Sequence, residues 1–157
     1  MNTARTEAAA VELGNGKVLI AGGFGPSSDC CSLASTELYD EATNSFEPLA
    51  NTPVMNVARS GVFAVMLTTG KVMIFGGGGT STELYDPATN SFAPASATPT
   101  TMINAPETAT LPNLGKVLVT VQSPVVELYD PTTNAFTLGP NMNLQSLGGV
   151  PTATLLK

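Results

Sequence analysis

Three stretches of the chain repeat one pattern of apolar and polar positions, and each stretch predicts a small antiparallel sheet. Each contains an apolar run, a Gly-Lys pair, a second apolar run and a Glu-Leu-Tyr segment. The second runs are KVLIA at 17–21, KVMIF at 71–75 and KVLVT at 116–120. Because these runs are apolar at consecutive positions, we expect strands that are buried on both faces.

Turn signals separate the expected strands. A glycine precedes the lysine in every unit and supplies the positive φ that a tight hairpin needs. After each Glu-Leu-Tyr, an Asp and a Thr-Asn pair indicate a type I turn, and a phenylalanine follows as a packing anchor. These segments are TELYDEATNSF at 36–46, TELYDPATNSF at 82–92 and VELYDPTTNAF at 126–136. Each unit therefore predicts four short strands.

The spacing of these units predicts the architecture. The tyrosines of the repeated segment are 46 and 44 residues apart, at Tyr39, Tyr85 and Tyr129. Four antiparallel strands in a unit of this length are typical of a propeller blade, which buries its faces against its neighbours. We therefore expect an all-β propeller sector of three four-stranded antiparallel blades plus one extra strand, in a single domain at 1–157. The blades are expected at about 4–57, 58–104 and 105–145, with a partial fourth unit at 146–157.

The motifs resemble a known repeat. A Gly-Gly doublet closing the second strand, a Tyr-Asp-Pro and a Thr-Asn-x-aromatic resemble the kelch repeat, in the bacterial form of the galactose oxidase central domain. Two departures stand out: the third unit has Val121 and Gln122 in place of the doublet, and all units have Phe where the family usually has Trp. Kelch rings of this kind typically have six or seven blades. The resemblance therefore implies either missing blades of a longer chain or a homodimer that completes a six-bladed ring.

Charge and composition exclude several classes of partner. Only 11% of residues are charged and the net charge is −6, so neither nucleic acid nor anionic lipid is an expected partner. No apolar run is long enough for a transmembrane helix, and the N-terminal residues do not form a signal peptide. The compartment stays unknown. It leans extracellular or periplasmic through the resemblance to secreted bacterial kelch proteins.

The residue types present argue against catalysis. The chain has no histidine, which removes the commonest general base and metal ligand and excludes a copper-radical site of the galactose oxidase kind. The Asp-box signature of sialidases is also missing. The recurring Glu37, Glu83 and Glu127 are interpreted as structural or solvent-facing. We expect a non-enzymatic protein with no cofactor and no metal. The alternative is a fragment of a larger oxidase or glycan hydrolase whose catalytic residues lie outside this chain.

The longest connection, FGPSSDCCSLAS at 24–35, is the first candidate for binding, because long loops on a rigid scaffold commonly carry it. Phe24 begins this loop, and Asp29, Cys30 and Cys31 lie near its tip. The two cysteines are adjacent, which excludes a long-range disulfide framework. The alternative is a tolerated insertion in which the cysteines are incidental.

Arg5 and Arg59 are the second candidates, because they precede the first strand of units one and two at matching positions. They would either line an anion-binding pocket near the channel entrance or bond to the carbonyls or carboxylates of a neighbouring blade. Together these features predict a binding module that recognises a protein or carbohydrate surface through its blade loops.

Overall fold

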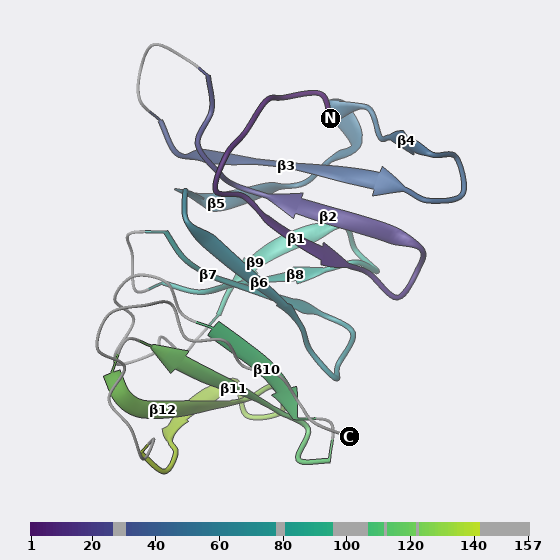
Figure 1. The fold of residues 1–157 in the computed structure, drawn as a ribbon. Coiled ribbons are helices and arrows are strands. Elements are labelled where there is room, and N and C mark those ends of the chain that lie inside the picture. Colours follow the sequence, from purple (N-terminus) through teal and green to yellow (C-terminus); the bar gives the residue numbers. More distant parts are fainter. Residues whose placement is uncertain (27–30, 78–80, 96–106, 112, 122, 142–157) are drawn as a thin grey trace.

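The protein folds into three antiparallel sheets stacked in sequence order, as the computed structural model shows (Figure 1). The structure describes residues 1–26, 31–77, 81–95, 107–111, 113–121 and 123–141. In Figure 1 the sheet of the N-terminal third lies at the top, the second sheet in the middle and the third at the bottom. This confirms the expected all-β propeller sector with three four-stranded blades.

The first sheet has the strand order β1-β2-β3-β4, and an additional strand, β5, pairs with β3. Its strands are β1 (Ala9–Glu12), β2 (Lys17–Ala21), β3 (Leu33–Asp40), β4 (Ser45–Phe46) and β5 (Val54–Arg59). A single turn of 3-10 helix, η1 (Leu49–Asn51), precedes β5. None of the helices in the described residues is long and apolar enough to cross a membrane.

The second and third sheets repeat the same four-stranded order. The second contains β6 (Val62–Met66), β7 (Val72–Gly76), β8 (Glu83–Asp86) and β9 (Ser91–Pro94). The third contains β10 (Glu107–Leu111), β11 (Lys116–Val121), β12 (Ser123–Asp130) and β13 (Ala135–Leu138). All pairs of neighbouring strands in these sheets are antiparallel.

The predicted extra strand belongs to the fourth unit at 146–157, which lies outside the described residues. The described part of the chain contains another additional strand, β5, which joins the first sheet by pairing with the N-terminal part of β3, with Leu33 opposite Arg59. The strand β3 already begins at Leu33, so the predicted loop at 24–35 is shorter than expected. The predicted boundary between 57 and 58 falls within β5.

Two apolar clusters hold the sheets together, one at each contact between neighbouring blades. The first joins one face of the first sheet, with Leu13 and Leu19, to a face of the second sheet with Ile74 and Tyr85. The second cluster joins the opposite face of the second sheet to the third, with the residues Val65, Leu67, Met73, Phe75, Val117, Val119 and Tyr129. The second blade is therefore covered on both faces, and its strand β7 is buried at every position, as its apolar run predicts.

The third unit departs from the others where its sequence does. Gly22, Gly23, Gly76 and Gly77 all adopt positive φ at the ends of the second strands. In the third unit the strand β11 continues through Val121, and its register with β12 shifts between Thr120 and Val121. Val121 occupies the position that matches Gly76, the last residue of β7, so the two strands end at the same place and the third unit differs by this register shift.

Candidate functional site

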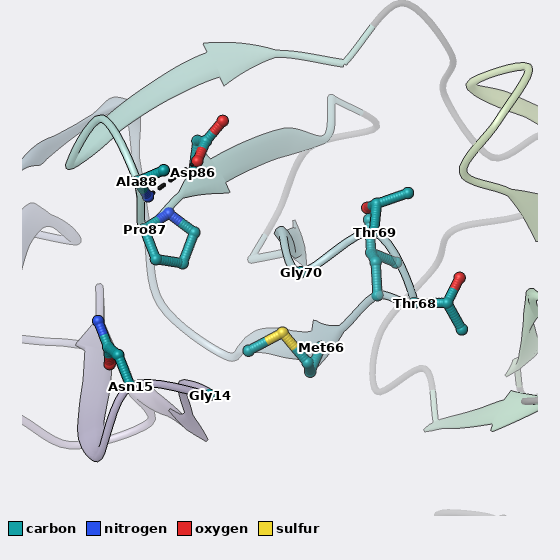
Figure 2. Close-up of a pocket in the computed structure, with 10 residues that line it drawn as sticks. Gly14, Asn15, Met66, Thr68, Thr69, Gly70, Asp86, Pro87 and Ala88 are labelled. Carbon is teal, nitrogen blue, oxygen red and sulfur yellow. Dashed lines mark hydrogen bonds between the residues drawn. The ribbon is translucent and has the colours of Figure 1, made fainter.

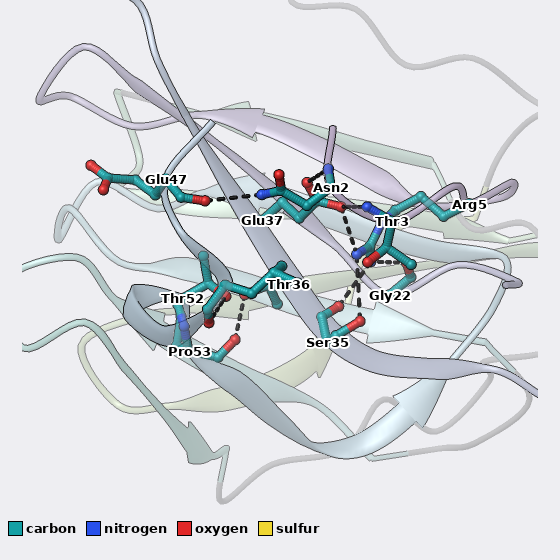
Figure 3. A network of polar contacts seen from close by, with 11 residues as sticks. Asn2, Thr3, Arg5, Gly22, Ser35, Thr36, Glu37, Glu47, Thr52 and Pro53 are labelled. Atoms are coloured by element: carbon teal, nitrogen blue, oxygen red, sulfur yellow. Dashed lines mark hydrogen bonds and ion pairs between the residues drawn. The ribbon is translucent and has the colours of Figure 1, made fainter. Parts of the chain in front are cut away.

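A buried ion pair lies at the loop end of the first blade (Figure 3). The Arg5 guanidinium is 3.0 Å from Glu37, and both side chains are almost completely inaccessible. Arg5 also donates hydrogen bonds to the carbonyl oxygens of Gly22 and Ser35, at 2.8 and 2.9 Å. The N–H groups of this guanidinium thus connect the segment before β1 to the ends of β2 and β3.

Glu37 collects donors from the N-terminal segment as well. Its carboxylate accepts the backbone N–H of Asn2 and, at 2.9 Å, that of Thr3. Burial alone would raise the pKa of Glu37, but the hydrogen bonds from Asn2, Thr3 and Arg5 outweigh it and hold this pKa below its ordinary value. Glu37 therefore remains charged inside the protein.

The second blade contains the same arrangement. The Arg59 guanidinium is 3.5 Å from Glu83, and it donates to the carbonyl oxygen of Gly76 at 2.9 Å. Glu83 accepts the backbone N–H groups of Asn56 and Val57, at 2.7 and 3.1 Å. We call these two groups, Arg5–Glu37 and Arg59–Glu83 with their backbone partners, the first and second clamps.

The second clamp links two blades. The backbone of Arg59 belongs to β5, which pairs with β3 of the first sheet, and its carbonyl oxygen accepts the Gly23 N–H at 2.8 Å. Its side chain reaches Glu83 on β8 of the second sheet. The structure therefore gives Arg59 bonds across a blade boundary to a carbonyl and a carboxylate, which is the structural alternative stated above. Whether either arginine also binds an anion stays a prediction.

The clamps show what sequence reasoning missed. Glu37 lies in β3 and Glu83 in β8, and they are 0% and 2% exposed, so these recurring glutamates are structural and not solvent-facing. Glu127 is buried at the matching position of the third sheet, although the chain has no third arginine. A glutamate that recurs beside Leu and Tyr at the same position of every unit was the signal that could have indicated a buried partner.

The opposite end of the blades carries a second set of ion pairs. The lysine of each Gly-Lys turn lies near the aspartate of the Asp turn in the same blade, at 3.7, 3.1 and 3.5 Å for Lys17–Asp40, Lys71–Asp86 and Lys116–Asp130. The hydrogen bond from Lys71 is the main reason that the pKa of Asp86 lies below its ordinary value. Each pair joins the two turns of one blade at the surface.

A shallow pocket lies between the turns of the first two blades (Figure 2). Its volume is about 480 Å³, and it is lined by Asn15, Met66, Thr68 and Pro87 among others. The Asp86 carboxylate at its rim is already occupied by the N–H of Ala88 at 2.9 Å and by Lys71. Apart from Asp86, the residues that line this pocket carry no charge. Within the part of the chain that the structure describes, no three His, Cys, Asp or Glu side chains gather in a way that could hold a metal.

The predicted binding loop lies at the clamp end of the first blade. Phe24 is 39% exposed, and its backbone forms isolated bridges with Thr6 on one side and Ser32 on the other. Cys31 is exposed at the base of the same loop. Asp29 and Cys30 lie outside the described residues. The structure thus brings Phe24 and Cys31 to one end of the blade, on the same side as both clamps.

Comparisons with known proteins agree with this geometry. Residues 5–53 match the family model of the kelch motif. The fold is similar to that of a solved structure of YjhT, with a TM-score of 0.70 and 14% sequence identity, over 88% of this chain and 53% of that one. The chain thus spans about half the length of that protein, and the likeness concerns the fold alone. No curated protein matches the chain.

Proposed function

We propose that this chain, a propeller sector with a kelch motif at residues 5–53, is a non-catalytic binding module whose recognition surface surrounds Phe24. The exposed ring of Phe24 is the observation that carries the proposal. Phe24 is the most exposed aromatic residue in the described part of the chain. Aromatic side chains that fill a partner's pocket commonly dominate the binding energy of an interface.

The backbone around Phe24 is held in place before any partner binds. The Phe24 N–H donates to the Thr6 carbonyl at 2.7 Å, and the Phe24 carbonyl accepts the Thr6 N–H at 3.0 Å. On the other side, Ser32 and Ser60 join their hydroxyl groups at 3.1 Å. A ring presented from a fixed backbone loses little conformational entropy on binding, which favours affinity.

The second clamp is bonded to the backbone next to Phe24. Gly23, the residue before Phe24, donates its N–H to the carbonyl of Arg59, whose side chain is buried against the second blade. Gly23 is also too closely packed for a side chain, since a Cβ atom would lie 2.6 Å from the Thr6 carbonyl oxygen. The backbone next to Phe24 is therefore fixed both by hydrogen bonds and by close packing.

A protein surface fits this site better than a carbohydrate. Sugar-binding sites combine an aromatic ring with polar side chains that remain available for hydroxyl groups. Near Phe24, the hydroxyls of Ser32 and Ser60 already bond to each other, and Arg5 is occupied by Glu37 and two carbonyls. The absence of histidine from the sequence supports a non-catalytic role.

The test is a paired screen of the purified chain against a peptide display library and a glycan array, followed by calorimetry on the ligand found. We expect a peptide ligand whose affinity falls at least about tenfold for Phe24→Ala, as for an aromatic interface anchor. Leu114→Ala is the matched control, since Leu114 is 64% exposed in a turn at the opposite end of the blades. It should bind within about twofold of the unchanged chain. The proposal would be contradicted if Phe24→Ala left the affinity for the ligand unchanged, or if the screen found no ligand.

A further inference from the structure

The two contacts between neighbouring blades use the same pair of faces. One is the tyrosine face, which in the second blade consists of Val72, Ile74 and Tyr85. The other is the leucine face, which in the first blade includes Leu13 and Leu19. At the next contact, the leucine face of the second blade (Leu67, Met73) meets the tyrosine face of the third (Val117, Val119, Tyr129). Each internal contact thus places a tyrosine face on a leucine face.

The first blade has a tyrosine face that no described residue covers to the same extent. At the internal contacts this face is fully buried, with Ile74 and Tyr85 at 0% and 1% exposure and Val119 and Tyr129 at 1% and 0%. The matching residues of the first blade, Val18, Ile20 and Tyr39, are all partly exposed. Since the residue types are nearly the same, the greater exposure arises because no sheet among the described residues packs on this face.

The third blade shows the complementary difference on its leucine face. Leu19 and Met73 are 0% exposed at the internal contacts, while the matching Leu118 is partly exposed. Leu13 and Leu67 are likewise 1% and 3% exposed, while the matching Leu111 is partly exposed. Within the described residues, the stack of three blades therefore has a tyrosine face on the outer side of the first blade and a leucine face on the outer side of the third.

We propose that a second copy of this chain covers both faces, so that two copies form a closed ring of six blades. The leucine face of each third blade packs on the tyrosine face of the first blade of the other copy. Both new contacts then repeat the contact that the chain already makes twice within itself. This proposal does not depend on the binding function proposed above.

The length of the matched structure supports this occupant. The fit pairs 88% of this chain with 53% of the YjhT chain, so two copies supply about the length of that one propeller. A contact between two different faces closes only when rotation brings the ends together, and otherwise produces open fibres. Two copies related by a twofold axis along the channel satisfy both contacts at once.

The N-terminal segment is also arranged for such a contact. Asn2, Thr3 and Arg5 bond to Glu37 as Asn56, Val57 and Arg59 bond to Glu83. Asn56, Val57 and Arg59 lie in β5, which pairs with β3 of the preceding blade. In the ring, the segment 2–5 takes the place of β5 and lies beside the start of β12 of the other copy.

The first measurement is the mass of the purified chain by light scattering coupled to size-exclusion chromatography, at concentrations from about 1 to 100 μM, where interfaces of this kind associate. We expect a single species of twice the 16.0 kDa chain mass. A folded species of one chain mass would overturn the proposal, because these faces would then stay uncovered by a second copy. A continuous series of larger species would overturn the closed ring.

Two variants then test the faces themselves. Ile20→Glu places a charge on the tyrosine face and Leu118→Glu on the leucine face, and each alone should give a monomer with an unchanged β-sheet circular dichroism spectrum. Mixing the two variants should restore a 1:1 dimer, because each mixed pair keeps one unaltered contact. Leu114→Glu, in a turn outside both faces, is the control and should remain a dimer. Dimers that persist in both single variants would overturn the assignment of the faces.

Discussion

The hydroxyl of Tyr85 donates a hydrogen bond to Oδ1 of Asn90 over 3.0 Å, and this bond closes the turn between β8 and β9. Asn90 has a positive φ of 51°, a conformation that asparagine tolerates better than most residues. Burial raises the pKa of Tyr85, so its hydroxyl stays protonated as a donor. The other blades repeat this bond at 2.7 and 2.8 Å, between Tyr39 and Asn44 and between Tyr129 and Asn134.

Two substitutions of Asn90 should separate what its backbone conformation contributes to the free energy of unfolding from what its side-chain hydrogen bonds contribute. Asn90→Gly keeps the positive φ but loses the bond to Tyr85 and a 2.9 Å bond to the Asn51 carbonyl, which we expect to cost about 1–2 kcal/mol. Asn90→Ala should cost about 1 kcal/mol more, because alanine is strained at positive φ. Urea unfolding measures both. Equal stability of the two variants would contradict a role for the backbone conformation.

Removal of Arg59 should be the most damaging single change at the second clamp. Arg59→Met leaves the Glu83 carboxylate buried at 2% exposure without its cation, and we expect a loss of about 3–5 kcal/mol in the free energy of unfolding. Arg59→Lys should recover only part of this loss, since an ammonium cannot reproduce the bonds to Gly76 and Ser81 together.

The exposed pair at the turn end is the control for this experiment. Lys71→Met removes an ion pair of 3.1 Å in which Lys71 is 45% exposed, so we expect a loss below about 1 kcal/mol. A similar loss for Lys71→Met and Arg59→Met would show that burial of the clamp does not determine its contribution.

Two glycines with almost the same backbone conformation should respond differently to alanine. Gly70 and Gly77 have φ values of 80° and 79°, so both variants carry the same backbone strain. A Cβ at Gly70 meets nothing within 4 Å, whereas at Gly77 it would lie 2.7 Å from the Arg59 Cβ and 2.8 Å from the Ser60 carbonyl oxygen. We expect Gly70→Ala to cost about 1 kcal/mol. Gly77→Ala should cost at least about 1 kcal/mol more through overpacking. Differential scanning calorimetry compares them, and equal melting temperatures would contradict close packing at the doublet.

Acid should weaken the Lys71–Asp86 pair of the second blade. The hydrogen bond from Lys71 holds the pKa of folded Asp86 below its ordinary value of 3.8. A group with a lowered folded pKa stabilises the fold fully above the unfolded pKa, and this stabilisation is lost as the pH falls through the folded value. Carboxyl NMR titration should show the pKa of Asp86 rising toward 3.8 in Lys71→Gln. Lys116→Gln, in the third blade, should leave it unchanged. An unchanged pKa in Lys71→Gln would exclude the lysine as the cause.

The fold was predictable because its signals are local and repeated. Gly16 and Gly70 occupy hairpin turns at positive φ, and the strands β2 and β7 coincide closely with the runs at 17–21 and 71–75. Tyr85 and Tyr129 are buried at the two contacts between blades. The turns and strands of such units are specified by residues that lie close together in the sequence. The sequence pattern is therefore sufficient to locate them.

The candidate sites were less predictable, because their residues meet through long-range contacts. Phe24 was identified from the length of its loop, but its exposure and its bridges to Thr6 and Ser32 appear only in the fold. The pairing of lysine with aspartate between two turns was not predicted, although both residues recur in every unit.

The sequence by itself determined three blades, their strand order and the turns between strands, since each depends on neighbouring residues and on a period repeated along the chain. Only the tertiary structure decided that Arg5 meets Glu37, 32 residues away, and that β5 carries Arg59 across a blade boundary. A buried charge is stable only where distant segments bring its counter-charge and hydrogen-bond donors together. That meeting depends on how blades stack, which no local pattern of apolar and polar residues specifies.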